Sequence, residues 1–157
     1  MMDMLSSRTT AAALAAALIA APAQGQTRPD TVITLAEAQA VAARAQRAAA
    51  EKKIDVAMVV VNREGRVILA QRMDRSSYIH LELAERKAAT AAATGAPTSL
   101  LEKVVDAGKT SLLSVPEIAL IGGAVPLRRG DEVIGGVGVS GGSPEDDENI
   151  SLAAAGI

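Results

Sequence analysis

The feature that most constrains the fold is a short apolar segment joined by a tight turn to a second extended segment. Asp55 to Val61 is rich in apolar, β-branched residues, which favours a strand buried on both faces. Asn62-Arg63-Glu64-Gly65 supplies turn residues, with Gly65 able to adopt positive φ, and Arg66 to Arg72 continues as a second strand. A turn this short allows only antiparallel pairing, so a β-hairpin is predicted.

A second hairpin is predicted between Ile118 and Gly142, where glycines interrupt apolar runs and Arg128-Arg129-Gly130-Asp131 forms a polar turn. Capping boxes, terminating glycines and a first-turn proline predict four helices. They cover about 34–52, 76–94, 99–108 and 144–155. This order predicts a single α/β (α+β) domain over 34–157, with an antiparallel sheet of about four to five strands flanked by helices.

The N-terminus has the three parts of a secretory leader. Arg8 precedes an apolar run from Ala11 to Ala21, and Ala21-Pro22-Ala23 is a small-x-small cleavage site before Gln24. We therefore expect a signal peptide over 1–23, a lead-in segment over 24–33, and export to the periplasm or the medium. After the leader no apolar stretch approaches the roughly 20 residues of a membrane span, so none is expected.

Composition narrows the possible partners. The net charge is −2, and the chain has no Phe, no Trp, no Cys and one Tyr. Without a basic stripe or stacking aromatic residues, nucleic-acid binding is not expected. A core of Ala, Val, Ile and Leu buries little area for each side chain, so we expect the chain to gain stability as a homo-oligomer.

An ordered set of motifs resembles the haem-degrading, HbpS/GlcG-like family. The motifs are Arg72-Met73-Asp74, then Glu82-Leu83-Ala84-Glu85-Arg86-Lys87-Ala88-Ala89-Thr90-Ala91, then Ala96-Pro97-Thr98, then Gly122-Gly123-Ala124-Val125-Pro126-Leu127, and finally Gly135 to Gly142 with Asp146, Asp147 and Glu148 after it. The resemblance implies a profilin-like fold and frequent assembly into oligomers. For exported members it also implies haem binding, with haem degradation as a further activity.

The second predicted helix carries the first group of candidate site residues. His80, Lys87 and Thr94 lie seven residues apart and therefore on roughly one stripe. A neutral His80 could ligate haem iron and Lys87 could neutralise a propionate. Thr90 and Thr98 are candidate oxygen ligands or hydrogen-bond donors, and Tyr78 and Met73 are further candidate axial ligands. A surface histidine and a solvated lysine are the alternative interpretations.

The glycine-rich stretch carries the second group. It lacks the spacing of a dinucleotide fingerprint and is better interpreted as a strand that allows close backbone or ligand approach. Gly138, Ser140 and Gly141 are therefore candidate ligand-binding residues, followed by N–H donors at a helix start. Asp146, Asp147 and Glu148 are candidate iron ligands, with helix capping as the alternative.

Three functions remain open from the sequence, and no catalytic residue is assigned. The first is an exported haem-binding protein, with haem and iron as expected cofactors and haem degradation as the added activity. The second is a GlcG-like enzyme or accessory protein for a small hydroxy- or oxo-acid, in which the glycine loop and Lys87 bind a carboxylate and Asp74 or Asp146 moves protons. The third is a non-catalytic oligomeric scaffold or signalling partner. One histidine, no cysteine and no G-x-S-x-G motif argue against a hydrolase.

Overall fold

The computed structural model describes residues 32–157, so the predicted leader and most of the lead-in segment lie outside the described residues. The described part forms a single α+β domain with one four-stranded antiparallel sheet, as predicted. Its elements are α1 (Leu35–Lys52), β1 (Ala57–Asn62), β2 (Val67–Arg72), α2 (Tyr78–Thr94), α3 (Thr98–Asp106), the 3-10 helix η1 (Thr110–Ser114), β3 (Ala124–Arg129), β4 (Glu132–Ser140) and α4 (Pro144–Ala155). Within residues 32–157, no helix has the length and apolar character needed to cross a membrane.

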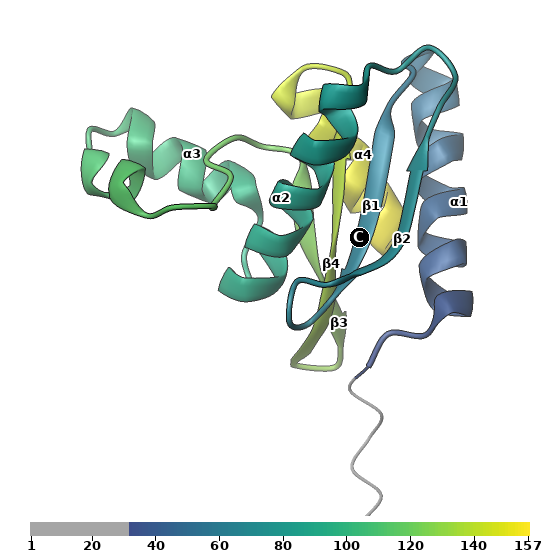
Figure 1. The fold of residues 1–157 in the computed structure, drawn as a ribbon, viewed down its shortest axis with the longest axis horizontal. Helices are drawn as coiled ribbons and strands as arrows, with labels where there is room; N and C mark the ends of the chain where they lie inside the picture. The colour runs from purple at the N-terminus through teal and green to yellow at the C-terminus, as the bar shows by residue number, and fades with distance from the viewer. Residues whose placement is uncertain (1–31) are drawn as a thin grey trace, which may run out of the picture.

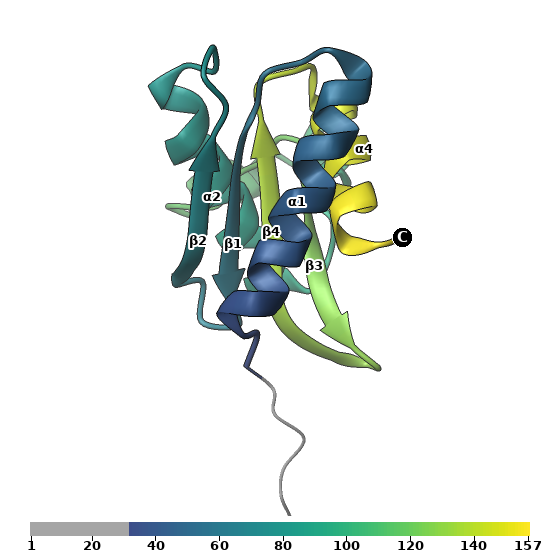
Figure 2. The ribbon, with the colours of Figure 1, turned by 90° about the vertical axis from the view of Figure 1, so that its right-hand side faces the viewer.

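The two predicted hairpins join edge to edge to make the sheet. The strand order is β2-β1-β4-β3, and every neighbouring pair is antiparallel (Figure 2). From Ala57 to Val61, strand β1 is fully buried, which matches its continuous apolar sequence. Gly65, at a φ of 74°, makes the predicted left-handed position in the β1–β2 turn. The sheet therefore has its two most buried strands, β1 and β4, at its centre.

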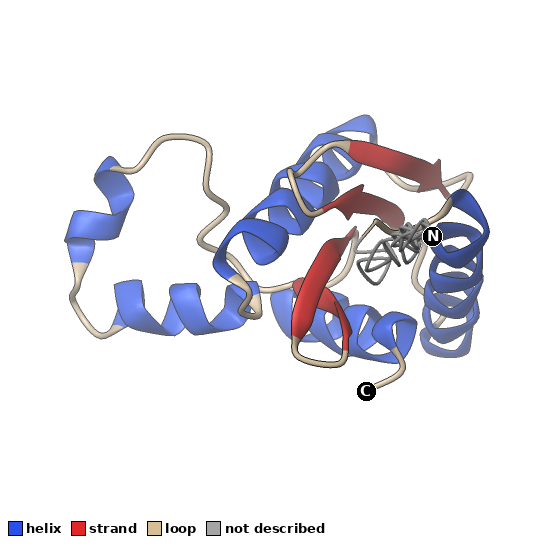
Figure 3. Cartoon of the chain, turned by 90° about the horizontal axis from the view of Figure 1, so that it is seen from below, coloured by secondary structure: helices blue, strands red, loops and turns tan. Residues whose placement is uncertain are grey.

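Helices cover both faces of the sheet. Helices α1 and α4 lie together on one face and α2 lies on the other (Figures 1 and 3). The larger core cluster joins α1 and α4 to alternate residues of the strands, such as Met58, Val60, Val137 and Val139. The smaller cluster joins Val59 and Val61 to alanines of α2. The alternation of strand residues between the two faces explains this division.

Helix α2 packs unusually close to β4, because glycines face it. A Cβ atom added at Gly136 would collide with the carbonyl oxygen of Ala88, and one added at Gly138 would collide with that of Ala84. The missing side chains thus allow the helix backbone to rest against the strand backbone. The predicted close backbone approach at the glycine-rich stretch is confirmed, and the group that approaches Gly138 is the protein's own helix.

The helix ends follow their predicted caps, with one exception. Thr34 and Glu37 form the predicted capping box of α1, and Ser143 caps α4. The predicted capping box at Ser99 is wrong, since α3 begins one residue earlier, after Pro97, with no side-chain cap. Ser99 instead donates its hydroxyl hydrogen to Glu148, so a tertiary contact has replaced the local one.

A helical arm projects from this compact body. The arm comprises residues 98–116 and contains α3 and the 3-10 helix η1, which the sequence analysis did not predict (Figures 1 and 3). Thr98 is the only buried residue of α3, and η1 has none. The arm is therefore attached to the domain mainly at its two ends.

The close packing of α2 on β4 predicts a specific sensitivity to one added methyl group. Gly138→Ala should lower the free energy of unfolding by about 3 kcal/mol or more, because a fixed backbone oxygen blocks the new atom. Urea denaturation followed by circular dichroism measures this. The control is Gly130→Ala in the β3–β4 turn, where the left-handed backbone costs about 1 kcal/mol but no atom lies within 4 Å of the added Cβ. Equal losses in the two variants would contradict this account of the packing.

Candidate functional site

The Lys87 helix α2 and the loop that follows β4 come together around a buried ion pair. The Nζ atom of Lys87 lies 3.0 Å from a carboxylate oxygen of Asp147 on α4, and the two side chains are 1% and 3% exposed. Lys87 also donates to the carbonyl oxygen of Val139, 3.2 Å away. The second Asp147 oxygen accepts from the amide of Gly142. Both charges thus have hydrogen-bond partners inside the protein.

The turn before β3 is built around this ion pair. Gly123 has a φ of 124°, and an added Cβ would lie 2.6 Å from the Lys87 Nζ atom. The Gly122 amide donates to Glu102 and the Gly123 amide donates to Glu148. Only glycine allows both this backbone conformation and this close approach. The carboxylates of α3 and α4 therefore hold the turn in place.

The other candidate site residues that lie in the interior also contact groups of the protein itself. Thr90 donates to the carbonyl of Arg86 and accepts from the amide of Ala119. Thr98 accepts from the amide of Ala124, and both threonines are buried. Ser140 is 2% exposed at the end of β4, and Gly141, at a φ of 149°, approaches the backbone of Asp55. The polar groups of these residues therefore serve mainly to assemble the fold around the ion pair.

The acidic run after the glycine loop does not form a cation site in this structure. Asp146 accepts from Lys52 and from Ser143, and the hydrogen bond from Lys52 is the main reason that its pKa lies below the ordinary value. Asp147 pairs with Lys87, and Glu148 accepts from Ser99 and Gly123. Among residues 32–157, no group of three or more His, Asp or Glu side chains is arranged to hold a metal ion.

His80 lies in the first turn of α2 and is partly exposed. Its Nδ1 atom lies 3.2 Å from the Ser76 hydroxyl, and its backbone amide donates to the Ser77 carbonyl. Nearby, Tyr78 is 77% exposed and Ile79 is 60% exposed, and the Arg72 guanidinium lies 4.7 Å from the centre of the Tyr78 ring. His80 and Lys87 lie on the stripe of α2 predicted from the sequence. His80 is at its partly exposed start, whereas Lys87 is buried further along the helix.

The outer side of α2 holds an open groove that the sequence analysis missed. The α2 groove has a volume of about 540 Å³ and is formed by the β1–β2 turn, α2 and the chain that returns from the arm. Its lining residues are Arg63, Glu64, Gly65, Arg66, Ala89, Thr90, Ala93, Pro116, Glu117 and Ile118. A neighbouring hollow of about 420 Å³ shares Ala89 and Glu117 with it. These volumes are typical of small-molecule sites.

The α2 groove combines an apolar surface with charges of both signs. Ala89, Ala93 and Ile118 supply the apolar part, Arg63 and Arg66 bring two guanidinium groups from the hairpin turn, and Glu64 and Glu117 bring two carboxylates. Glu117 has a φ of 67°, a left-handed conformation that costs a residue other than glycine about 1 kcal/mol or more. Strain of this kind concentrates at functional positions.

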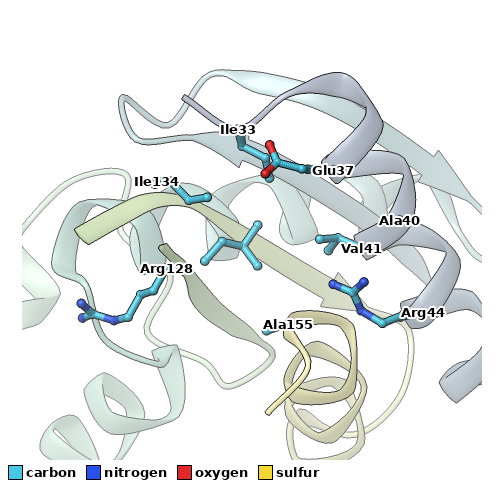
Figure 4. A pocket seen from close by; sticks show the side chains of 9 residues that line it. Ile33, Glu37, Ala40, Val41, Arg44, Arg128, Ile134 and Ala155 are labelled. Carbon is cyan, nitrogen blue, oxygen red and sulfur yellow. The ribbon is translucent and has the colours of Figure 1, made fainter. Parts of the chain in front are cut away.

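A second hollow lies between α1, the β3–β4 hairpin and the end of α4 (Figure 4). Its volume is about 200 Å³, below the usual range for a ligand site. The Arg44 Nε atom at its edge donates to the Ala154 carbonyl, and Glu37 pairs with Arg129. Its polar groups therefore bind the elements to one another.

Comparison with known proteins identifies relatives over the whole domain. A model of the family described as haem degrading protein HbpS-like matches residues 33–156. Protein GlcG from Escherichia coli is 31% identical over 103 residues, covering 66% of this chain and 77% of GlcG. HbpS from Streptomyces reticuli, solved as a double mutant, is 31% identical with a TM-score of 0.75, covering 94% of this chain and 97% of HbpS. A solved PduOC:Heme complex is 29% identical with a TM-score of 0.72, covering 80% of this chain and 94% of that one.

The buried pair predicts a large difference between two lysine substitutions. Lys87→Met should lower the free energy of unfolding by about 3 to 5 kcal/mol, because Asp147 keeps a buried charge without its cation. The matched control is Lys52→Met, which breaks an ion pair of similar length to Asp146 at the surface and should cost less than about 1 kcal/mol. Urea denaturation at neutral pH compares the two. Restoring most of the loss with Lys87→Met combined with Asp147→Leu would support the mechanism, whereas equal single-variant costs would contradict it.

Proposed function

The chain belongs to the family described as haem degrading protein HbpS-like, and from that premise we propose that it binds haem. The observation that carries the proposal is its similarity, along nearly the whole domain, to a protein that was solved as a complex with haem. The chain's own contribution to the argument is a groove of about 540 Å³ that two arginines border.

We place haem in the α2 groove. Arg63 and Arg66 would hold the propionates, since guanidinium groups form charge-assisted, often bidentate, hydrogen bonds with carboxylates. Ala89, Ala93 and Ile118 would pack against the macrocycle. Small side chains suit this role, because they leave room for a flat ligand beside the helix. The absence of Phe and Trp from the sequence is thus compatible with an open groove.

Bound haem supplies an iron centre for redox and oxygen chemistry. Two carboxylates line the groove, those of Glu64 and Glu117, and we assign the iron ligand to Glu117, whose backbone is held in the left-handed region. Pro116 and Ile118 flank it and would exclude water from one side of the ligand. The protein's role at this site is therefore to hold the propionates, shield the ring and offer one anionic ligand.

His80 lies outside this proposed site. It precedes Ala89 by nine residues, or about 180° around an α-helix, so the two side chains point to opposite sides of α2. The Ser76 hydroxyl at its Nδ1 atom also gives His80 a local structural role at the helix start. We therefore assign the iron ligand to the groove rather than to the histidine.

The small-acid function is less well supported. In that hypothesis Lys87 and the glycine loop bind the carboxylate, but Lys87 is already paired with Asp147 and its side chain is only 1% exposed. Asp146, its candidate proton carrier, is bound to Lys52. In the α2 groove, Arg63 and Arg66 would bind a small carboxylate ligand through the same interactions as haem propionates.

The proposal predicts a Soret shift that depends on the groove. Titration of the purified protein with haem should give a shifted Soret band at micromolar concentrations. Arg63→Gln combined with Arg66→Gln should raise Kd about tenfold, which corresponds to about 1.4 kcal/mol. The control is Arg47→Gln on α1, across the sheet from the groove, which should bind as the wild type does. No spectral shift for the wild type would refute haem binding itself.

Two further variants locate the iron ligand. Glu117→Gln should change the position of the Soret band, whereas His80→Ala should leave it unchanged. The opposite pattern would indicate that the iron ligand lies at the start of α2, and it would still support haem binding. Degradation, which the family description includes, would appear as loss of the band with time when a reductant and dioxygen are supplied.

We also propose that the chain is exported before it acts. The Arg8, Ala11 to Ala21 and Ala21-Pro22-Ala23 pattern supports this. Expression in a Gram-negative host should deliver a shortened protein to the periplasmic fraction, and its N-terminal sequence should begin at Gln24. An Ala21→Leu and Ala23→Leu variant should keep the leader, because a bulky residue blocks the small-x-small site. A wild-type protein of full length in the cytoplasmic fraction would contradict export.

A further inference from the structure

A single hydrogen bond holds one wall of the α2 groove to the helix beside it. The groove wall, residues 116–118, is the part of the chain that returns from the arm and lines the groove. The amide of Ala119, the next residue, donates to the side-chain oxygen of Thr90 on α2 at 2.9 Å. Among the hydrogen bonds of residues 32–157, this is the one that joins residues 116–121 to the rest of the domain. The position of the wall therefore depends on Thr90.

Apolar packing gives the groove wall little further support. Pro116 and Ile118 belong to neither core cluster of residues 32–157 and do not pack against one. Glu117 lies between them with a left-handed backbone, at a φ of 67°. A strained conformation of this kind persists only where the surrounding structure fixes it. The hydrogen bond of Ala119, two residues further along the chain, supplies such a fixed point.

Thr90 is oriented to accept this hydrogen bond. Its side chain is buried, and its hydroxyl donates to the carbonyl oxygen of Arg86, one helical turn earlier, at 2.8 Å. A hydroxyl group has one hydrogen, so toward any other partner the Thr90 oxygen acts as an acceptor. A β-branched side chain also has few rotamers in a helix, and the bond to Arg86 selects one of them. The oxygen is thus held where the Ala119 amide meets it.

We propose that Thr90 is a positioning residue for the ligand of the α2 groove. Through Ala119 it sets where Glu117 and Ile118 stand relative to the alanines of α2. The inference rests on the haem site proposed above, and it gives Thr90 a role other than that of an oxygen ligand. Because its hydroxyl is buried and bonded to two backbone groups, the hydroxyl acts on the ligand through the wall.

The other end of the arm provides a matched control. The side-chain oxygen of Thr98 accepts from the amide of Ala124 at 3.1 Å, and Thr98 is fully buried. It makes the same kind of bond as Thr90, but it is not among the residues that line the α2 groove. Replacing either threonine by valine keeps its shape and leaves a buried amide without its acceptor. Both variants should lose stability, whereas only the Thr90 variant should lose affinity for haem.

The first test is a haem titration followed at the Soret band. Thr90→Val should raise Kd about tenfold, a change typical of one lost hydrogen bond that leaves a buried donor unpaired. It should also shift the band, because Glu117 is no longer held in place. Thr90→Ser keeps the hydroxyl and should restore both the affinity and the band position. Thr98→Val should bind haem as the wild type does.

Amide hydrogen exchange without haem tests the hydrogen bond itself. The Ala119 amide should be protected in the wild type. In Thr90→Val, residues 116–121 should exchange at least tenfold faster while the sheet keeps its rates, and Thr98→Val should leave this segment unchanged. An Ala119 amide that exchanges freely in the wild type would overturn the proposal, and this result requires no variant to fold.

The two measurements separate this inference from haem binding itself. A wild-type protein that does not bind haem would refute the proposed function, and the exchange rates would then decide whether Thr90 holds the wall. Wild-type affinity in Thr90→Val would overturn the role of Thr90 and leave haem binding intact. An equal loss of affinity in Thr98→Val would do the same, since it would show a general effect of destabilisation. Circular dichroism of each variant establishes that the domain is folded.

Discussion

The close approach of α2 to β4 is the packing constraint on which the rest of the structure depends. Glycines at positions 136 and 138 allow the helix backbone to lie directly on the strand. At this short distance Lys87 reaches past the end of β4 to Asp147, which belongs to the helical layer on the other face. The ion pair therefore connects both helical layers and the turn at Gly123. A larger residue on β4 would displace α2 and, with it, the buried lysine.

This close packing of the layers limits where a ligand can bind. Since small residues bring the layers so close, the polar side chains of the interior find partners within the protein, as Thr90, Thr98 and Asp147 do. Haem needs a volume of several hundred Å³, which such an interior does not offer. The outer side of α2 differs, because the hairpin turn and the returning arm leave a groove above its alanines. The proposed haem site therefore lies on the outer surface of the same helix.

The sequence predicted those features that depend on neighbours along the chain. Both hairpins, the capping box at Thr34 and the start of α4 at Ser143 rest on residues a few positions apart. The capping box predicted at Ser99 failed because Glu148, far along the chain, accepts the serine hydroxyl. The pairing of Lys87 with Asp147 and the α2 groove likewise join distant segments. Arg63, Ala89 and Glu117 have no local pattern that would bring them together, so the sequence alone did not predict the groove.

The arm and the groove share the residues that connect them. Pro116 ends the arm, and Pro116, Glu117 and Ile118 form one wall of the groove. Any partner that fixes the arm also fixes this wall, and any ligand that contacts the wall restrains the arm. Thermodynamic linkage then requires the two effects to be reciprocal: if a partner bound to the arm strengthens haem binding by some factor, haem strengthens the binding of that partner by the same factor. The left-handed backbone at Glu117 lies at the junction, where a change in the direction of the arm would move the carboxylate proposed as the iron ligand.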